Sequence, residues 1–515
     1  MQTALHREIE RQAKKAIRKT RRDAELQSKY RKRFHKRTGL VPSPPTRSIR
    51  PPVHRHFDPV YVKRHAKFLA RAIWNKVLAG QYQPLPAVVH KIEKPSGGVR
   101  EIRAFSIPDA ALANLLMRSA RDRNLKRLPP HSYAYRPDKN LFDAILTLRA
   151  FDSTNKMFAV QIDFEKFFDS IPHGYIKEKV DDPNGLSLTP HERFVFKEFL
   201  AHRFSEPDGW TENSNQRSHR GTPQGSSVSL LLANMANHDL DQRLGLQPGI
   251  FVRFADDVTA LCSSYAHAQE LEQTFRDHCT NSNLTLNKIK SPGISIVSNR
   301  WKEIRTEQSF TYLGYKFSED GLSIPDTSIQ KLKIKISRLI NIYLIRSLRL
   351  GFNGSRASVS NPQYDWDLLG LITEIRNILY GGLSESDLQE FVVHGRKLNQ
   401  MRGYMGFFCL LDDAAPLKEL DGWLLSTIRR AQAKRNLELG ARYGAACPTP
   451  SNRQLATGSW LDARAWRGGM PPNARVPSLV RGWRAARKHY FTFGLEEVQA
   501  PNYGQYLDFD FDLYE

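Results

Sequence analysis

The sequence has few cysteines and no long apolar run. Among its 515 residues are four cysteines, Cys262, Cys279, Cys409 and Cys447, which lie far apart and form no Cys-x-x-Cys pair. This spacing argues against a zinc module and a disulfide framework, and it is typical of proteins from a reducing compartment. The first residues, MQTALHREIERQAKK, have no apolar run and so do not form a secretory signal. No segment approaches the roughly 20 apolar residues that span a bilayer. We therefore expect a soluble, cytoplasmic protein.

Acidic residues are scarce relative to basic ones. The chain has 53 Asp and Glu against 77 Lys and Arg, a net charge of +24. Such an excess favours a polyanionic partner, because each phosphate that a cation neutralises releases condensed counterions. An unselective basic surface is the alternative.

Half of this excess lies in residues 1–50, which contain 16 Lys and Arg but only four Asp and Glu. A basic helix over residues 3–36, followed by the Pro-rich stretch VPSPPTRSIRPP (residues 41–52), predicts an arm that grips RNA or DNA phosphates. A disordered solubilising tail would have a similar composition.

The remaining chain changes character along its length. Helical and short extended stretches alternate between residues 57 and 150, and residues 156–317 have a mixed α/β pattern. Residues 328–440 are predicted to be helical, beginning with apolar residues at helical spacing: Ile329, Leu332, Ile336, Leu339, Ile340 and Tyr343. Residues 441–515 are rich in Pro, Gly, Trp and Arg and are predicted to be irregular.

A first candidate ligand for a metal ion is Asp163. In MFAVQIDFEKFFDSIPH the apolar residues Phe158, Val160 and Ile162 alternate, as in a strand with one buried face. Asp163 then falls at the end of that strand, a suitable position for holding a metal ion. By itself it could equally be a strand cap.

Two further carboxylates lie in IFVRFADDVTALC. Two β-prone runs, residues 250–254 and 258–261, flank Ala-Asp-Asp, which predicts a hairpin with Asp256 and Asp257 at its tip. Adjacent like charges repel unless solvent or a cation compensates them, so a solvated turn is the alternative. Together with Asp163, they supply the three carboxylates that two Mg²⁺ ions need for in-line phosphoryl transfer.

Two turns could approach phosphates. In RGTPQGSSVSLLLANMANHDLDQRL, Gly221, Pro223 and Gly225 predict a tight turn before a helix over residues 230–240. In KIEKPSGGVREIRAFSIP a Ser-Gly-Gly turn predicts a basic hairpin, which could also be merely an exposed charged one. The cations that flank this turn are Lys91, Lys94, Arg100 and Arg103.

The order and the sequences of these motifs resemble those of bacterial reverse transcriptases, especially the group II intron-like lineage. KPSGGVREIRAFSIP and HSYAYRPDKN resemble fingers motifs, QIDFEKFFDSIPH the first palm motif, and GTPQGSSVSLLLAN the Pro-Gln-Gly motif. VRFADD stands for the Tyr-Ala-Asp-Asp signature, with Phe254 in place of Tyr. LTLNKIKS and FTYLGYKF resemble the motifs that close the palm.

The resemblance implies an α+β right-hand polymerase fold. Its expected parts are a basic arm and linker (residues 1–52), fingers (53–155), a palm of antiparallel sheet and helices (156–320), a helical thumb (321–440) and a C-terminal extension (441–515). The implied activity is RNA-directed DNA polymerisation with two Mg²⁺ ions, for which Mn²⁺ can substitute. The implied partners are an RNA template, DNA product and dNTPs, with no membrane; a homo-oligomer is compatible.

The resemblance also implies roles for individual residues. Asp163 and Asp256 would ligate both metals, with Asp257 nearby and the backbone carbonyl of Phe164 as a further ligand. Phe168 would exclude the 2′-hydroxyl, and Gln224 would lie against the nascent base pair. The remaining implied residues are Arg100, Arg103 and Arg136 for the triphosphate, and Lys290 for the departing pyrophosphate.

The biological role is predicted by exclusion. Leu230 and Ala134 depart from the common group II pattern, and no Cys/His endonuclease cluster follows residue 440. By exclusion the chain resembles the bacterial defence-associated reverse transcriptases, and this resemblance implies an antiphage defence enzyme that works with a noncoding RNA. The alternatives are a maturase that acts as an RNA-binding splicing factor, and a catalytically silent scaffold. A further prediction is that a C-terminal tyrosine primes synthesis, and the alternative is that the C-terminal aromatic side chains simply pack. The candidates are Tyr490, Tyr503, Tyr506 and Tyr514.

Overall fold

The computed structural model divides the chain into two compact units. One comprises residues 1–23 and 47–309, and the other residues 24–46 and 310–515. The structure describes residues 1–38, 51–93, 97–151, 156–298, 306–346, 348, 365–398, 401–444, 446–447, 449–462, 464, 466 and 470–498. The long helix α1 (Gln2–Thr38) confirms the helix predicted over residues 3–36.

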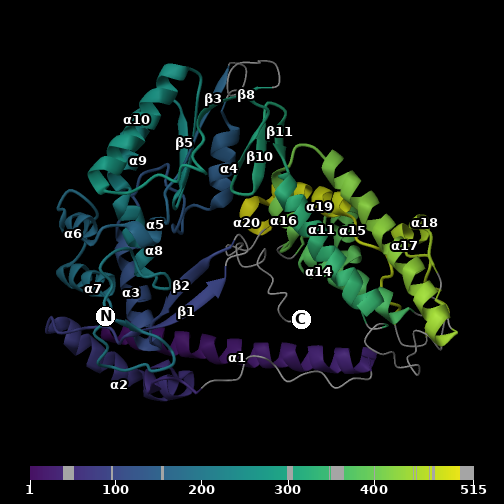
Figure 1. Cartoon of the computed structure of the whole chain (residues 1–515), viewed down its shortest axis with the longest axis horizontal. Helices are drawn as coiled ribbons and strands as arrows, with labels where there is room; N and C mark the ends of the chain where they lie inside the picture. Colours follow the sequence, from purple (N-terminus) through teal and green to yellow (C-terminus); the bar gives the residue numbers. More distant parts are fainter. Residues whose placement is uncertain are drawn as a thin grey trace. The chain divides into compact units, whose positions relative to one another are not determined.

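The first unit is built around a five-stranded sheet. Its strand order is β5-β6-β3-β7-β8, and β3 lies in the centre, antiparallel to β6 and β7 (Figure 1). The strands are β3 (Met157–Asp163), β5 (Ile250–Phe254), β6 (Asp257–Cys262), β7 (Gly293–Val297) and β8 (Thr306–Glu307). Helix α10 (Tyr265–Ser282) packs on β3, β6 and β7. The central strand can therefore place a terminal side chain beside both neighbours.

A second, three-stranded sheet in this unit has the order β2-β1-β4. Its strands β1 (Ala87–Glu93) and β2 (Val99–Ala104) form the predicted basic hairpin, and β4 (Phe204–Ser205) pairs with β1. The helices of the unit are η1 (Arg55–Phe57), α2 (Pro59–Leu78), α3 (Ile107–Arg123), α4 (Leu141–Arg149), α5 (Phe167–Ser170), α6 (His173–Asp181), α7 (Pro190–Leu200), α8 (Val228–Ala236) and α9 (His238–Gly245).

The start of α1 contributes to the core of the first unit. Leu5, Ile9 and Ala13 are fully buried at helical spacing, in the same apolar cluster as residues of α2 and α3. Glu8 is buried on this face and pairs with Arg118 of α3 at 2.9 Å. The first turns of the predicted arm are thus packed, because a helix with an apolar stripe buries it against neighbouring elements.

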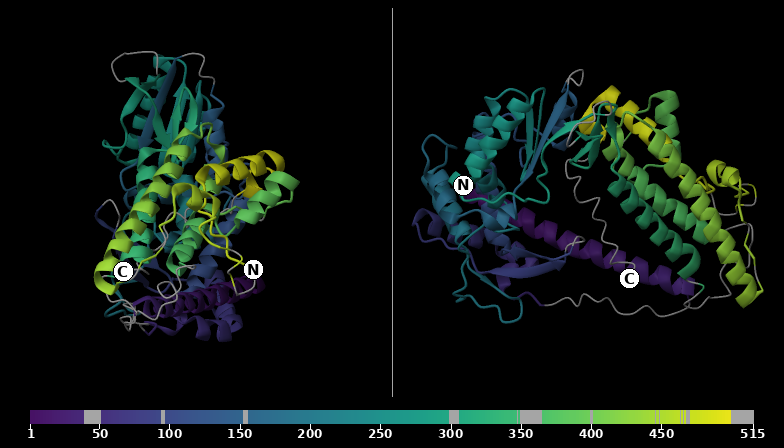
Figure 2. Two further views of the ribbon diagram at one scale, coloured as in Figure 1. Left: turned by 90° about the vertical axis from the view of Figure 1, so that its right-hand side faces the viewer. Right: turned by 45° about the horizontal axis from the view of Figure 1, so that its top comes forward.

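The second unit is mostly helical. Its small sheet has the order β11-β10-β9, with strands β9 (Phe310–Tyr312), β10 (Tyr315–Ser318) and β11 (Gly321–Ser323). Helices α11, α14 and α17 run side by side (Figures 1 and 2). The helices are α11 (Asp326–Ile340), η2 (Asn341–Arg346), α14 (Trp366–Tyr380), α15 (Glu385–His394), α16 (Tyr404–Phe407), η3 (Phe408–Leu410), α17 (Ala415–Tyr443), α18 (Asn452–Thr457), α19 (Leu479–Phe493) and α20 (Leu495–Val498).

Several local predictions are confirmed and three need correction. The helix predicted from residue 328 is α11 continued by η2, and its repeated apolar residues are buried, Ile329 only partly. The strand at residues 157–163 is correct, but side chains on both of its faces are buried, because other elements, among them α10, pack on the sheet. The single helix predicted over residues 230–240 is two helices, α8 and α9, interrupted at Asn237.

The prediction of irregular structure after residue 440 is wrong for residues 479–493, which form α19. Gly482 lets this helix approach closely, since a Cβ there would lie 2.5 Å from the ring of Tyr380. Tertiary packing thus stabilises a helix that its Gly, Trp and Arg content concealed.

No helix in the described part of the chain combines the length and the hydrophobicity needed to cross a membrane.

Candidate active site

Two of the predicted carboxylates face each other across neighbouring strands. Asp163 is the last residue of β3, and Asp257 is the first of β6, and the two are directly paired in the antiparallel register. Asp256 precedes Asp257 in the turn from β5. This turn depends on Ala255, whose φ of 63° places a non-glycine residue in the left-handed region. The hairpin predicted from Ala-Asp-Asp therefore brings both of its carboxylates beside Asp163.

The segment after α10 holds Asp163 in place. Lys290 Nζ lies 3.0 Å from Asp163 Oδ2, and Asn287 Nδ2 donates to the same oxygen at 3.2 Å. The backbone N–H of Asp163 donates to Ser291 Oγ at 3.0 Å, and the N–H of Asn287 donates to the carbonyl of Asp163 at 2.8 Å. Sequence reasoning identified Lys290 but missed Asn287 and Ser291, although both lie in the LTLNKIKS region.

The electrostatics of the three carboxylates are coupled. Burial raises the pKa of Asp257 to about 7, and the charges of Asp163 and Asp256 add to this effect. Burial also raises the pKa of Asp256, and Asp163 adds to it, whereas Lys290 and Arg100 oppose the shift. The site thus concentrates more negative charge than its surroundings neutralise. A divalent cation is the kind of ligand that would compensate it.

This donor set fits a magnesium ion in its chemistry, since hard cations prefer carboxylate and carbonyl oxygens. Within the described ranges, no group of three or more His, Cys, Asp or Glu side chains forms a preformed metal-binding site. The fit therefore rests on the type and coupling of the carboxylates.

The Pro-Gln-Gly turn packs against the turn that follows β3. The N–H of Thr222 donates to the carbonyl of Phe168 at 2.6 Å. Gly221 has a φ of +78°, and a Cβ there would lie 2.7 Å from the same carbonyl oxygen. Gln224 Nε2 donates to Asp169 Oδ1 at 2.7 Å, so Gln224 and Phe168 are held on adjoining turns.

The same turn also holds the basic hairpin. The N–H of Arg103 in β2 donates to the carbonyl of Gln224 at 2.7 Å. Gly225 has a φ of +119°, and a Cβ there would lie 2.5 Å from the carbonyl oxygen of Arg103. Only glycine combines this backbone conformation with so close an approach.

One part of the chain matches a known protein family. Residues 92–317 match the family model described as reverse transcriptase (RNA-dependent DNA polymerase). This part of the chain is similar to reverse transcriptases. The mixed α+β architecture fits the right-hand polymerase fold of that family.

Individual relatives are distant. Protein YkfC of Escherichia coli (strain K12) is 23% identical over 178 residues, which are 33% of this chain and 44% of that protein. The chain thus spans less than half the length of this relative. Telomerase from Candida albicans, solved with a fragment of telomeric RNA, has 14% identity and a TM-score of 0.36 over 73% of this chain and 67% of that one. Apo telomerase from Candida tropicalis has 12% identity and a TM-score of 0.33, over 50% and 66% of the two chains.

The matched region also has an aromatic contact that sequence reasoning missed. The ring of Tyr135 meets Phe168 edge-on, with 6.4 Å between centroids. Tyr135 has a φ of 65°. Burial raises its pKa to about 12, and the charge of Asp256 adds to the shift. Its place in the quoted motif HSYAYRPDKN was the available signal.

The three predicted arginines of the matched region differ in their surroundings. Arg100 is exposed and acts electrostatically on Asp256. Arg103 lies over the ring of Phe204 at 3.9 Å and pairs with Glu101. The side chain of Arg136 is only 4% exposed.

The guanidinium of Arg136 is already hydrogen-bonded within its own loop. It pairs with Asp138 at 2.6 Å and donates to the carbonyls of Leu128, Pro129 and Ser132. These bonds hold Arg136 within the loop, and its assignment to the triphosphate stays a prediction.

Of the candidate tyrosines, Tyr490 lies in α19 beside Phe491. Tyr503, Tyr506 and Tyr514 lie outside the described residues.

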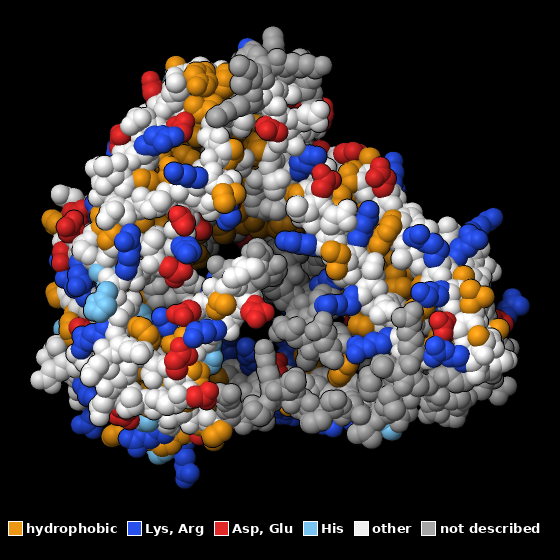
Figure 3. Space-filling view, viewed as in Figure 1, with side chains coloured by type: hydrophobic (Ala, Val, Ile, Leu, Met, Phe, Trp, Pro, Cys, Tyr) orange, Lys and Arg blue, Asp and Glu red, His pale blue; other side chains and the backbone are white. Residues whose placement is uncertain are grey.

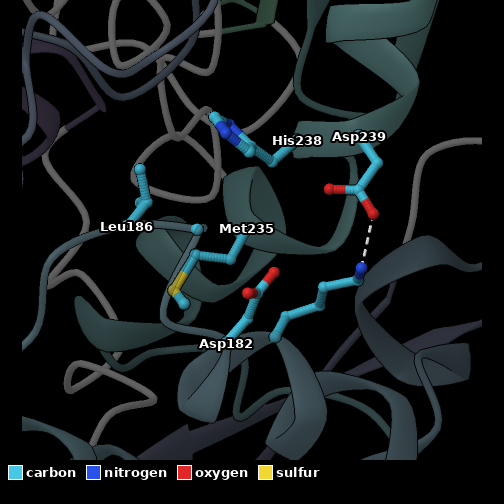
Figure 4. A pocket seen from close by; sticks show the side chains of 7 residues that line it. Asp182, Leu186, Met235, His238 and Asp239 are labelled. Atoms are coloured by element: carbon cyan, nitrogen blue, oxygen red, sulfur yellow. Dashed lines mark hydrogen bonds and ion pairs between the residues drawn. The ribbon is translucent and has the colours of Figure 1, made fainter.

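A small pocket of the matched region involves none of the predicted site residues (Figure 4). Lys179 and Asp239 form an ion pair at its edge. Its lining residues are Lys179, Asp182, Gly185, Leu186, Met235, His238 and Asp239. Nothing in this lining links the pocket to the carboxylates.

Proposed function

We propose that the chain is a reverse transcriptase that extends a primer with deoxynucleotides on an RNA template. The observation that carries this proposal is the pairing of Asp163 with Asp257, with Asp256 in the adjoining turn and Lys290 at 3.0 Å from Asp163. We further assign the fingers and palm to residues 53–320 and the thumb to residues 321–440, between the basic arm and the C-terminal extension.

Asp163, Asp256 and Asp257, with the backbone carbonyl of Phe164, would hold two Mg²⁺ ions. When bound, such ions lower the pKa of the attacking hydroxyl and neutralise charge at the transferred phosphate. The raised pKa of Asp257 supports this assignment, since an uncompensated buried carboxylate resists ionisation.

The remaining residues orient and select the nucleotide. Phe168 would exclude a 2′-hydroxyl by its bulk, and Gln224 would lie against the nascent pair. Arg100, Arg103 and Arg136 are the candidates for binding the triphosphate, because guanidinium groups match phosphate oxygens. Lys290 Nζ would donate a proton to the departing pyrophosphate.

The polymerase assignment is tested with Asp256→Asn combined with Asp257→Asn. We expect this variant to incorporate no dNTP on a primed RNA template, because both carboxylates of the hairpin lose their charge. Asp181→Asn with Asp182→Asn is a matched control, since it changes another adjacent pair of aspartates in the same unit. Full incorporation by the Asp256/Asp257 variant would refute the assignment.

We propose antiphage defence, with a cognate noncoding RNA as template, as the biological setting, and the bacterial cytoplasm as its location. The alternative is a maturase that mainly binds intron RNA. The exposed cations Arg18, Lys19 and Arg22 of α1 would serve either role. Sequencing the RNA and DNA that copurify with the wild type and the Asp256/Asp257 variant separates them. A noncoding RNA with complementary DNA supports defence, whereas intron RNA without DNA supports the maturase.

Priming by a tyrosine stays a prediction of the sequence. Protease treatment of purified product tests it, because DNA attached to protein changes mobility after digestion. Unchanged mobility would exclude the linkage.

A further inference from the structure

A buried arginine lies directly behind the catalytic hairpin. Arg253 is in β5, two residues before Ala255, and sequence reasoning gave it no role. Only 1% of its surface is exposed, and by volume it is the largest of the fully buried residues in the described part of the chain. A guanidinium stays charged in proteins, so such burial requires compensation.

The compensation comes from Asp241 of α9, the helix that packs on β5. Arg253 Nε donates to Asp241 Oδ1 at 2.7 Å, and Nη2 donates to Oδ2 at 2.5 Å. The Asp241 side chain is fully buried. This two-bond geometry is the strongest that an arginine and a carboxylate can form, and it fixes the plane of the guanidinium.

The other three N–H groups of Arg253 also have acceptors. Nη1 donates to the carbonyl of Ala255 at 2.9 Å and to Asn234 Oδ1 at 3.3 Å, and Nη2 donates to Ser132 Oγ at 2.8 Å. All five donors are therefore satisfied by five acceptors. One side chain connects α8, α9, the loop at residue 132 and the turn before Asp256.

The loop at residues 131–135 is also joined to the backbone of Arg253. The N–H of Arg253 donates to the carbonyl of His131, and the N–H of Tyr133 donates to the carbonyl of Arg253, both at 3.0 Å. Asn234 Nδ2 donates to the carbonyl of Ala134 at 3.1 Å. This loop ends in Tyr135, whose ring contacts Phe168.

Two residues next to these bonds have left-handed backbones. Ala255 has a φ of 63° and leads into Asp256, and Tyr135 has a φ of 65° and contacts Phe168. Such conformations are unfavourable for side chains other than glycine and persist only where the surroundings hold them. Arg253 donates to the carbonyl of Ala255, and it also donates to Ser132 in the loop that ends at Tyr135.

We propose that Arg253 is a positioning residue that locks the Asp256 turn and the Tyr135–Phe168 contact into one geometry, and so sets both dNTP affinity and the exclusion of ribonucleotides. This inference rests on the proposed polymerase function. Arg253 does not itself touch the reactants. It acts by holding the two sides of the nucleotide site, and lysine cannot replace it, because an ammonium lacks the planar five-donor fork.

The test compares Arg253→Lys, Ser132→Ala and Arg243→Lys. Arg243 is an exposed residue of α9 paired with Asp277, so Arg243→Lys is a matched surface control. Ser132→Ala removes one bond of Arg253 and leaves its ion pair intact. Each protein is assayed for kcat and KM with dNTPs and rNTPs on a primed RNA template, and for its melting temperature.

We expect Arg253→Lys to lower kcat/KM for dNTPs on the order of 10²-fold, as small displacements in active sites do. Ser132→Ala should raise KM for dNTPs and lower the dNTP/rNTP preference while the protein remains folded. Arg243→Lys should match the wild type. A wild-type dNTP/rNTP preference in Arg253→Lys would contradict the requirement for the planar guanidinium.

A merely structural role gives a different result. It would reduce the fraction of active enzyme, so that kcat falls while KM and the dNTP/rNTP preference stay unchanged. That outcome in folded Ser132→Ala and Arg253→Lys overturns the inference, and Ser132→Ala decides alone if Arg253→Lys does not fold. If the wild type incorporates no dNTP, the proposed function fails and this inference with it.

Discussion

At the residue scale, the candidate site depends on close backbone approaches as much as on its charged groups. Gly221 and Gly225 lie at positive φ against the carbonyl oxygens of Phe168 and Arg103. These contacts bring the basic hairpin, the turn after β3 and the Pro-Gln-Gly turn together. The predicted nucleotide-binding side chains of these three segments thereby lie close together, although they are far apart in the sequence.

Gly225→Ala should impair polymerisation, because a methyl group would lie 2.5 Å from the carbonyl oxygen of Arg103. We expect lower dNTP incorporation and a loss of stability of about 1–3 kcal/mol from the unfavourable backbone conformation alone. Gly98→Ala separates the two effects, since Gly98 also has a positive φ (+85°), but a methyl group there would have no atom within 4 Å. Equal losses of activity in both variants would contradict the role of the close approach.

Phe168→Ala should relax sugar selection. Removing the ring opens space for a 2′-hydroxyl, so incorporation of rNTPs relative to dNTPs should rise roughly 10–100-fold, the range set by small steric differences in a pocket. Steady-state incorporation of both nucleotide types measures it. Phe168→Tyr keeps the bulk of the ring and should retain the wild-type preference for dNTPs. An unchanged preference in Phe168→Ala would show that Phe168 does not exclude the 2′-hydroxyl.

At the scale of elements, α14 and α17 are joined by a buried ionic cluster in the second unit. Asp365 caps α14 by accepting from the N–H groups of Asp367 and Leu368. Arg435 of α17 pairs with Asp365 at 2.5 Å and with Asp367 at 3.1 Å. Gln432 Nε2 donates to Asp365 Oδ2 at 3.0 Å. The cap of one helix is thus the partner of the next.

Arg435→Met should destabilise the second unit by about 3–5 kcal/mol, because two buried carboxylates would lose their cation. The midpoint of chemical denaturation, followed by circular dichroism, measures this change. Arg442→Met is a control on the same helix, since Arg442 pairs at the surface with Glu438. A loss no larger than that of Arg442→Met would show that the cluster does not stabilise the unit.

The same cluster predicts a pH dependence. Burial alone would raise the pKa of Asp365, but Arg435, Gln432 and the N–H of Leu368 outweigh it and hold this pKa below its ordinary value. An unfolded aspartate has a pKa of about 3.9. The stabilisation by Asp365 is therefore complete above about pH 4 and is lost as the pH falls through the folded-state pKa.

We expect Asp365→Asn to be less stable than the wild type near neutral pH and to lose less further stability in acid. Melting temperatures between about pH 3 and pH 7, a range that spans the ordinary pKa of aspartate, measure the difference. Parallel curves for the two proteins would argue against a lowered pKa.

At the scale of the whole molecule, the net charge of +24 should dominate the affinity for nucleic acid. Basic side chains are spread over the visible face of the molecule (Figure 3). On the described part of α1, an exposed row at helical spacing comprises Lys15, Arg18, Lys19 and Arg22. This row continues past the buried residues that anchor the start of the helix.

Changing these four cations of α1 to Gln should weaken binding of a primed RNA template and flatten its salt dependence. The slope of log K against log salt should fall by roughly 0.7–0.9 for each phosphate contact that is lost. Fluorescence anisotropy at several salt concentrations measures it. Changing Lys179, Lys197, Arg243 and Arg276 to Gln removes the same charge from cations already paired with carboxylates. Identical slopes for the two variants would exclude a specific role for the row.

Much of the secondary structure around the candidate site could be predicted from the sequence alone. Alternation around Phe158 and Val160 indicated β3, the two β-prone runs indicated the Asp256–Asp257 hairpin, and the apolar spacing after residue 328 indicated α11. These features were readable because they depend on neighbours in the chain. The motif order likewise indicated a resemblance to reverse transcriptases, and residues 92–317 match the model of that family.

Which groups are buried, and which donors are already engaged, became evident from the tertiary structure and not from the sequence. Arg253 and Arg136 both looked like ordinary cations, yet one is fully buried with five acceptors and the other serves its own loop. Helix α19 was hidden because its packing on α14 and α16, rather than its composition, stabilises it. Burial and hydrogen bonding depend on residues far away in the chain, and the spacing of side chains along a sequence carries no measure of them.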